Sequence, residues 1–289
     1  MLAPGSPGTL RCVRARAALF DVYGDHLRSR GGVAPVAALV RLLAPLGIAA
    51  PAVRTAISRM VRQGWLTPAE LPSGPGYGLT GRAVQRLDDA AVRIYRTRDA
   101  AAWPGRWHLL VISPPASRSA RNRLAAELAF LGYGQLAAGA WIAPWRSGEA
   151  ATRVTAHGGQ VEEFTAEQLG DPEVMVRQAW DLDRLAAAYD RFVEDFAPLV
   201  ATVGALATDE QAFAARSRLV HTWRKFLFAD PGLPPDLLPE RWAGRRAAAF
   251  FDAEASRLLP AATRFVTACL APTEAVSLPT EVASPARRH

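Results

Sequence analysis

Apolar residues recur at helical spacing in three consecutive segments near the start of the chain. The segments span residues 14–30, 34–48 and 51–63. A spacing of three and four residues places side chains on one face of a helix, so each segment predicts an amphipathic helix. Gly47 and Gly64 follow the second and third segments, where glycine commonly ends a helix. The pattern therefore predicts three short helices in succession.

The next segment has the character of a small hairpin. Residues 65–67 and 77–80 are short and strand-like, and the stretch between them is rich in proline and glycine. A further helix is predicted over residues 81–96. Three helices followed by a hairpin are the layout of a winged helix-turn-helix, in which the helix before the hairpin lies in the DNA major groove. We predict such a domain over residues 14–98.

The pattern changes in the middle of the chain. The apolar run at 106–113 predicts a strand, residues 116–134 predict a helix, and residues 135–144 predict a second strand. Residues 152–165 give a weaker pair of strand or loop pieces. Strands and helices in this order predict a small α/β sandwich over residues 99–170.

The last third is helical in pattern. From residue 171 to the mid-260s, apolar positions keep the helical spacing, which predicts a C-terminal helical domain over residues 171–268. The terminal segments 1–13 and 269–289 are rich in proline or polar residues, and we predict that they are disordered. The expected fold class is therefore mainly α, with α+β parts.

Positive charge is concentrated in the N-terminal third. Residues 1–98 contain 14 arginines against five acidic residues, a net charge of +9, whereas the remainder has 20 basic and 22 acidic residues, a net charge of −2. A local excess of arginine attracts polyanions, first nucleic acid and second anionic lipid. A compositional bias explains why arginine replaces lysine, which occurs once, but it does not explain why the excess lies in one third.

The third predicted helix has an outer face that is basic and carries no carboxylate. Its apolar face consists of Val53, Ile57, Met60 and Val61. Its outer face carries Arg54, Thr55, Ser58, Arg59 and Arg62. A guanidinium group can pair bidentately with a guanine edge or a phosphate, and short hydroxyl side chains let the backbone approach DNA closely.

We interpret this outer face as a DNA-reading surface. Arg54 and Arg59 are expected to contact bases or phosphates, and Arg62 is expected to hold a phosphate. The complete set of predicted DNA contacts is Arg54, Thr55, Ser58, Arg59, Arg62 and Tyr77, the last near the base of the hairpin. The alternative is a plain surface helix whose arginines pair with acidic residues elsewhere. The order of elements and the local charge excess favour DNA binding.

Several segments resemble the phenylacetic-acid-degradation repressor family, the PaaX-like regulators. The resemblance is carried by LFDVYGDHL, VRTAISRMVRQGWL, YGLTGRA, WPGRWHLLVI, LAFLGYGQLAAGAWIAP and RLVHTWRKFLFADPGLPPDLLPERWAG. It covers most of residues 17–260 in the family's order. The segments VRTAISRMVRQGWL and DPGLPPDLLPERW are the most specific.

The resemblance implies three parts and a regulatory function. These are a winged helix-turn-helix, a central ferredoxin-like domain related in fold to a small CRISPR-adaptation protein, and a C-terminal helical domain. It also implies a homodimeric repressor of phenylacetate catabolism that an aryl- or acyl-CoA thioester, such as phenylacetyl-CoA, releases from its double-stranded DNA operator. Family wings usually carry Gly-Arg-Arg before the tyrosine, whereas this chain reads SGPGYGLT. That departure weakens one expected phosphate contact and is compatible with a different operator.

Two groups of side chains could bind such an effector. One is an aromatic wall for a flat acyl group, formed by Trp103, Trp107, Trp141 and Trp145; the alternative is that these residues only pack in the core of the middle domain. The other group would face the CoA phosphates and consists of His221, Arg224 and Lys225. Its alternative is an exposed helix face or an ion pair with the acidic residues of 181–196.

No motif indicates catalysis, a metal site or a cofactor. The five histidines are scattered, and Cys12 and Cys269 lie near opposite ends of the chain. Where the related CRISPR fold cuts nucleic acid, it uses an aspartate at the end of its first strand, and the corresponding HLLVISPPAS contains no acid. No phosphate-binding loop or nucleophile motif occurs. We therefore predict a protein that is not an enzyme and needs no metal or cofactor.

The apolar runs are too short for a membrane segment. None approaches the roughly 18 residues that a spanning helix needs, and the N-terminus lacks the long apolar region and cleavage site of a signal peptide. A cytoplasmic location is therefore expected. Two other functions stay open: a ligand-independent architectural DNA-binding protein, and a nuclease-like or CoA-ester-processing enzyme with a DNA-binding appendage.

Overall fold

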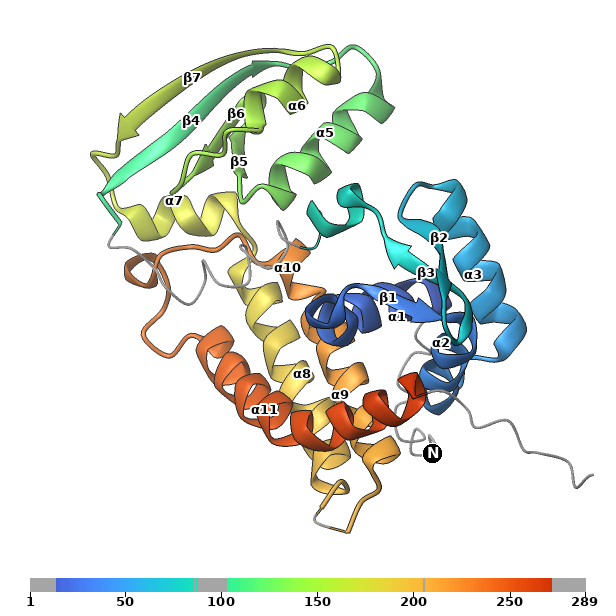
Figure 1. Cartoon of the computed structure of the whole chain (residues 1–289). Coiled ribbons are helices and arrows are strands. Elements are labelled where there is room, and N and C mark those ends of the chain that lie inside the picture. Colours follow the sequence, from blue (N-terminus) through green and yellow to red (C-terminus); the bar gives the residue numbers. More distant parts are fainter. Residues whose placement is uncertain (1–13, 86, 88–102, 205, 272–289) are drawn as a thin grey trace, which may run out of the picture.

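Helices α1, α2 and α3 and a small sheet form the N-terminal region of the computed structural model, which describes residues 14–85, 87, 103–204 and 206–271 (Figure 1). The helical elements are α1 (Ala15–Val22), the π-helical turn η1 (Tyr23–Leu27), the 3-10 turns η2 (Arg28–Arg30) and η3 (Ala44–Leu46), α2 (Val36–Leu43) and α3 (Ala50–Arg62). The strands are β1 (Val33–Pro35), β2 (Leu66–Leu71) and β3 (Gly74–Leu79).

The three predicted helices and the hairpin are confirmed, and the sheet has one strand that was not predicted. Strands pair antiparallel in the order β1-β3-β2, so β1 extends the hairpin on the side of β3. The hairpin strands are also longer than predicted, and only Pro72 and Ser73 form the turn. Glycine in β3 permits the third strand, because a Cβ at Gly76 would lie 2.8 Å from the backbone oxygen of Ala34.

The helix predicted over residues 81–96 can be followed only in part. Residues 81–85 and 87 are helical. The remainder of that prediction lies outside the described residues.

The central region is a four-stranded antiparallel sheet with helices on its faces. Its strands are β4 (Arg106–Ser113), β5 (Gly134–Ala137), β6 (Ala140–Ala143) and β7 (Gln160–Glu167), in the order β5-β6-β4-β7. Its helices are α5 (Arg118–Phe130) and α6 (Ala150–Ala156). Both pack on one face of the sheet, where Leu110, Ile112, Leu128 and Val154 share a buried cluster (Figure 1).

Two predictions for the central region were wrong. Residues 135–144 form two strands rather than one, because the chain turns at Ala138 and Gly139, whose φ is +80°. Of the pair of strand or loop pieces predicted over residues 152–165, the second is confirmed as part of β7, but residues 152–156 lie in helix α6. Threonine and valine favour strands locally, but burial of Ala150 and Val154 against the sheet selects the helix.

The C-terminal region is helical, as predicted. Its elements are α7 (Pro172–Ala179), α8 (Leu182–Ala201), α9 (Asp209–Trp223), α10 (Phe226–Ala229), the 3-10 turn η4 (Pro235–Leu237) and α11 (Ala243–Leu270). Helix α11 ends two residues beyond the predicted boundary, and Cys269, which was placed in the disordered tail, is buried. Residues 1–13 and 272–289 lie outside the described residues. In the described part of the chain, no helix is both long and apolar enough to cross a bilayer.

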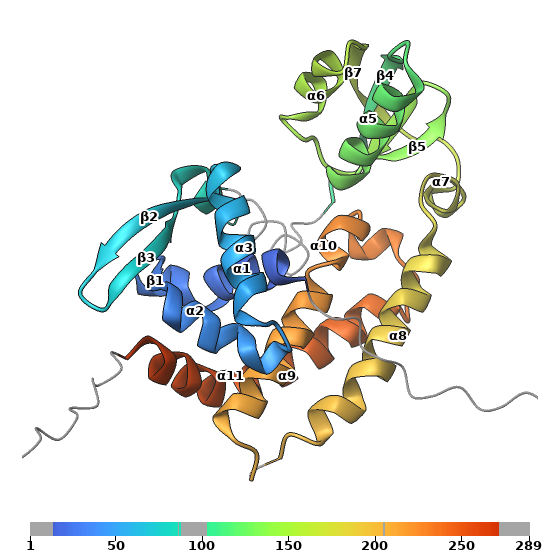
Figure 2. The ribbon, with the colours of Figure 1, turned by 90° about the vertical axis from the view of Figure 1, so that its right-hand side faces the viewer.

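The N-terminal and C-terminal regions share one apolar core. Phe213 of α9 and Ala262, Val266 and Cys269 of α11 pack in the same buried cluster as the inner faces of α1, α2 and α3. Figure 2 shows the end of α11 beside α2 of this region. A second buried cluster joins α8, α9 and α11 to Trp107 of the central sheet. Helices α9 and α11 therefore contribute to both cores.

Candidate nucleic-acid interface

Helix α3 lies at the outer edge of the N-terminal region with its apolar face turned inward (Figure 1). Val53, Ile57 and Met60 are buried against α1 and α2. Pro51 occupies the first turn, where its missing N–H costs nothing, and Gly64 follows the helix with a φ of +70°. The buried face fixes the rotation of the helix about its axis, so the opposite face must point to solvent.

The predicted polar face is exposed as one continuous stripe. Its five members are all solvent-exposed: Arg54, Thr55, Ser58, Arg59 and Arg62. Among residues 14–85, 87, 103–204 and 206–271, none of the three guanidinium groups has a carboxylate or hydrogen-bond partner. Positive charge that is left unpaired within the described chain is available to an external anion.

The two hydroxyl side chains of this face are bonded to their own helix. Thr55 Oγ1 donates to the backbone oxygen of Pro51 at 2.9 Å, and Ser58 Oγ donates to that of Arg54 at 3.1 Å. Each hydroxyl oxygen retains lone pairs and can accept a hydrogen bond from a base amino group. To donate to a phosphate, either hydroxyl must first rotate away from its carbonyl.

The hairpin carries no positive charge. Residues 66–80 contain neither arginine nor lysine, and Glu70 on β2 is exposed. Tyr77 is half-buried against the shared core rather than standing clear of it, and its backbone oxygen accepts a 2.7 Å hydrogen bond from Tyr23 Oη. Its ring therefore has a packing role, whatever contact its edge makes with a ligand.

Arg82 is a cation close to this surface that sequence reasoning missed. Its guanidinium lies 4.5 Å from the ring centre of Trp65, which in turn meets Phe20 of α1 at 5.4 Å edge to face. The position of Arg82 just after the hairpin, at the start of a predicted helix, was the available signal. This stack ties the base of the hairpin to the first helix.

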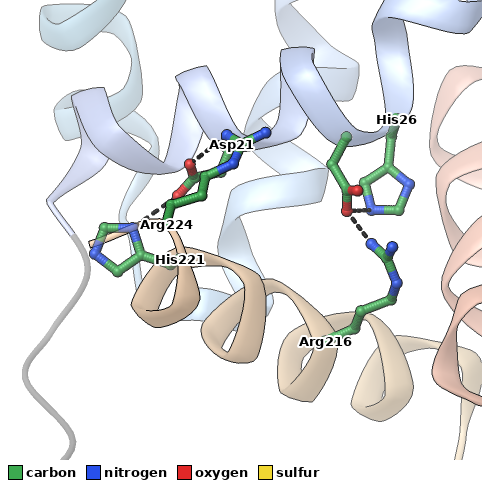
Figure 3. Close-up of polar contacts among 6 residues, drawn as sticks. Asp21, His26, Arg216, His221 and Arg224 are labelled. Carbon is green, nitrogen blue, oxygen red and sulfur yellow. Dashed lines mark hydrogen bonds and ion pairs between the residues drawn. The ribbon is translucent and has the colours of Figure 1, made fainter. Parts of the chain in front are cut away.

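Two of the three acidic residues in residues 14–85 face inward, and Glu70 on β2 is exposed. Asp21 and Asp25 lie on α1 and η1 and face α9. Asp21 binds His221 Nδ1 with Oδ2 and Arg224 Nη1 with Oδ1, each at 2.7 Å (Figure 3). The predicted effector residues His221 and Arg224 are thus engaged in an ion pair. Its partner is not an acid of 181–196, as the alternative held, but an aspartate about 200 residues earlier.

A second, more deeply buried pair lies beside the first. Arg216 Nη1 donates to Asp25 Oδ2, and Arg216 Nε donates to the backbone oxygen of Ala255 at 3.0 Å (Figure 3). Burial lowers the pKa of Arg216 to about 10, which leaves it charged at neutral pH. His26 Nε2 lies 3.2 Å from Asp25 Oδ2 without the alignment of a hydrogen bond. Burial, helped by the charges of Arg30 and Arg224, lowers the pKa of His26 to about 4.

The four tryptophans of the predicted aromatic wall do not lie together. Trp103 and Trp107 meet at 4.8 Å, and Trp107 stacks on Trp180 at 6.2 Å. Trp141 belongs to the cluster on the opposite face of the sheet, beneath α5 and α6. The indole Nε1 groups of Trp107 and Trp180 are buried and have no hydrogen-bond partner among the residues that the structure describes. Lys225, the remaining predicted effector residue, is exposed.

The central region also contains a polar network that was not predicted. His108 Nδ1 lies 2.6 Å from Tyr133 Oη, and His108 Nε2 lies 3.1 Å from Glu163 Oε2. Burial lowers the pKa of His108 and raises that of Tyr133. These groups satisfy one another between β4, β5 and β7. No cluster of three or more potential metal ligands occurs in the described parts of the chain.

Comparison with known proteins gives consistent matches along the whole length. Three family models match successive parts: PaaX-like protein over residues 14–83, PaaX protein central Cas2-like domain over 100–173, and PaaX-like protein C-terminal domain over 180–268. The transcriptional repressor PaaX of Escherichia coli (strain K12) is 30% identical over 266 residues, which cover 88% of this chain and 84% of that protein.

A solved structure extends the likeness to three dimensions. The uncharacterized protein Rv0674 from Mycobacterium tuberculosis matches with a TM-score of 0.62 at 25% sequence identity. The match covers 90% of this chain and 99% of that one. The arrangement of all three regions is therefore shared with another protein chain.

Proposed function

This chain belongs to the PaaX-like protein family, and from that premise we propose that it is a sequence-specific DNA-binding transcriptional repressor. Its N-terminal region would act as a winged helix-turn-helix, with α3 in the major groove and the hairpin of β2 and β3 as the wing. The central region would be a ferredoxin-like domain, in keeping with the Cas2-like match. The proposal draws on the name of the Escherichia coli relative, a transcriptional repressor.

The exposed face of α3 is the observation that carries the proposal. Arg54, Arg59 and Arg62 lie on a helix whose rotation is fixed by its buried face, and they lack carboxylate partners in the described chain. A rigid helix with unpaired arginines suits DNA, because phosphates and guanine edges supply the missing acceptors. Arg54 and Arg59 are assigned to bases or phosphates and Arg62 to a phosphate, with close contacts from Thr55 and Ser58.

The wing is expected to contribute less affinity than a basic wing would. Without arginine or lysine, the wing cannot form ion pairs with DNA phosphates. The carboxylate of Glu70 would repel the phosphate backbone of DNA. Its glycines still allow the peptide backbone to approach a groove closely. Tyr77 supports the base of the wing and is the remaining assigned contact.

The proposed regulatory state is a homodimer that an aryl- or acyl-CoA thioester releases from DNA. A two-fold dimer would place two α3 helices on the half-sites of a palindromic operator. The effector must bind the DNA-incompetent arrangement more tightly than the competent one. Trp103 and Trp107 are retained as the acyl contacts, because the free Nε1 donors of Trp107 and Trp180 could bind a thioester carbonyl.

Two of the three side chains proposed to bind the CoA phosphates must first leave their present partner. Exposed Lys225 can meet a CoA phosphate directly. His221 and Arg224 can do so only after leaving Asp21. We therefore assign Lys225 as the first phosphate contact and treat the other two as contacts of the released state.

The test is fluorescence anisotropy on the DNA upstream of the protein's own gene, with a scrambled duplex as the control. Arg59→Ala should weaken binding to the native duplex by about 1–3 kcal/mol, which is roughly 5- to 150-fold. Arg246→Ala is the matched control, because it removes an exposed arginine that pairs with Asp190 on the far helices. Equal binding to native and scrambled DNA would instead favour the architectural alternative.

A titration then tests the effector. Phenylacetyl-CoA, other acyl-CoA thioesters and free CoA are added to the preformed complex. Loss of anisotropy with one thioester and not with free CoA is the expected result. DNA binding that no thioester disturbs would remove the effector from the proposal and leave the repressor. Conversion of a thioester to free CoA during the titration would favour the enzyme alternative.

A further inference from the structure

The contacts between α1–η1 and α9 form a polar seam with two separate points of attachment. At one point Asp21 binds His221 and Arg224; at the other Asp25 binds Arg216. We propose that this polar seam fixes the orientation of the N-terminal region on the C-terminal helices and so aims α3, with Asp21 and Asp25 as positioning residues. The inference rests on the proposed function in one respect: the aim of α3 matters because α3 is taken to read DNA.

Two separate polar contacts can fix how the N-terminal region is oriented on the C-terminal helices, whereas an apolar contact alone does not. The shared core around Phe213 and Val266 holds the regions together, but hydrophobic contact has no preferred direction. Hydrogen bonds from Arg30 to Thr267 and from Arg41 to the backbone of Cys269 add directional contacts only at the end of α11. Charged hydrogen bonds are directional and shorter than neutral ones. Arg216 and Arg224 lie eight residues apart on α9, about two helical turns. Contacts at both positions would prevent α1–η1 from rotating relative to α9 about the shared core.

The backbone of η1 is shaped for this seam. The turn is π-helical, with the amide of Arg28 bonded to the oxygen of Tyr23, and such turns occur in helices mostly at functional positions. Gly24 lies directly over the guanidinium of Arg224, because a Cβ there would come within 2.7 Å of Arg224 Nη2. A side chain at this position would force the guanidinium of Arg224 to shift, and we expect that shift to weaken its bond to Asp21.

The seam also lies on the route between α3 and the central region. On one side, Phe20 of α1 meets Trp65, just beyond α3, and α1 and α3 share a core. On the other side, α9 contributes Leu219 to the cluster that contains Trp107, with Trp223 packed against it. A shift of α9 caused by a ligand at Trp107 would therefore reach α3 through the seam.

The charge balance makes each acid hard to replace. Three cationic or titratable groups of α9 surround two carboxylates, and all five side chains are less than a quarter exposed. Removing Asp21 leaves Arg224 without its counter-charge, next to the charge of Arg216. A partly buried cation without a counter-charge is unfavourable, so we expect Arg224 to move toward solvent and the two helices to separate or rotate.

The experiment measures interdomain distance in the full-length chain by pulsed electron paramagnetic resonance. Spin labels are placed at exposed Ser73 and Glu194 in a Cys12→Ser, Cys269→Ala background, diluted with unlabelled protein. Asp21→Ala is the test variant. Gly24→Ala is the second, because it keeps every charge and its new Cβ would crowd the guanidinium of Arg224 at 2.7 Å and the side chain of Leu87 at 3.1 Å. Asp190→Ala, which breaks an exposed pair with Arg246, is the matched control.

We expect one narrow distance distribution for the parent and for Asp190→Ala. Both seam variants should broaden or shift it, with a smaller change for Gly24→Ala. On native upstream DNA, the same variants should lose about tenfold or more in affinity while binding to scrambled DNA is unchanged, since aim affects only the specific complex. Circular dichroism checks that the helices are retained.

The outcomes separate the inference from the function on which it rests. An unchanged distance distribution in a folded Gly24→Ala protein overturns the seam, whatever happens on DNA. A broadened distribution with undiminished specific affinity shows that the seam does not aim α3 and overturns that part. If the parent has no sequence preference, the proposed function fails, while the distance measurement still decides the orientation.

Discussion

The two faces of the N-terminal region differ in whether their charged side chains have partners. On the outward face of α3, three arginines are exposed and have no carboxylate partner in the described chain. On the inward face, Asp21 and Asp25 are partly buried, and each carboxylate binds an arginine of α9 or of its C-cap, Arg216 or Arg224. The same region thus combines a surface available to a ligand with a surface that is already satisfied. The difference lies in the placement of Asp21 and Asp25, whose carboxylates are paired with side chains of the C-terminal region.

The largest expected effect is on the inward face. Asp25→Ala leaves the guanidinium of Arg216 buried with only the backbone oxygen of Ala255 as an acceptor. An unpaired buried charge should lower the free energy of unfolding by about 3–5 kcal/mol. Urea denaturation measures it. Arg54→Ala on the outward face, the control, should stay within about 0.5 kcal/mol. Similar losses for both variants would contradict the contrast between the faces.

The second expected effect is a pH dependence of folding stability that arises from His26 on the inward face. The pKa of His26 falls from 6.5 to about 4 on folding. Between these two pH values, His26 is therefore protonated in the unfolded chain and neutral in the folded chain. Stability is therefore complete above about pH 6.5 and is lost as the pH falls towards 4, at up to about 1.4 kcal/mol per pH unit. His26→Gln should flatten this part of the curve. Denaturation at several pH values provides the comparison, and parallel curves would contradict the prediction.

The third expected effect is a loss of DNA affinity from a change on the outward face, without a change in folding stability. Arg62→Ala should weaken binding to native and scrambled DNA alike and reduce the slope of log affinity against log salt concentration by about 1, because one phosphate contact is lost. Anisotropy at several salt concentrations measures the slope. An unchanged slope would remove Arg62 from the phosphate contacts.

The smallest effect concerns the two hydroxyls. Thr55→Ala and Ser58→Ala each remove a bond to an i−4 backbone oxygen that is exposed and can turn to water. Thermal unfolding should change by less than about 0.5 kcal/mol. Any loss of DNA affinity then reports a direct contact, worth about 0.5–1.5 kcal/mol per hydrogen bond. A Val53→Ala control, in the core, should lose stability instead.

Local patterns predicted the elements that carry the outward face. The spacing of apolar residues in 51–63 and the glycine after it give α3 almost to the residue, and the run at 106–113 coincides with β4. Both depend on neighbouring residues alone. The exposure of Arg54, Arg59 and Arg62 follows directly from the same periodicity, because the buried side of a helix determines its opposite side.

The inward face could not be predicted in the same way. Asp21 and His221 are 200 residues apart, and no local spacing indicates their meeting. Strand β1 was missed for a related reason, since three residues become a strand only by pairing with β3. One signal was present: Asp21 and Asp25 are four residues apart, beside the apolar positions of the first helix. Acids at such a position require a partner from elsewhere in the fold.

The last helix has a consequence for synthesis of the chain. Residues 262, 266 and 269 complete the core of the region that contains α3, although nearly 200 residues separate them from it. During translation at about 5–20 residues per second, this region therefore waits roughly 10–40 seconds for its final packing partners. Until then its inner apolar faces are open to solvent. The part proposed to read DNA is thus made well before its core is complete, so chains truncated before α11 are expected to lack a folded reading helix.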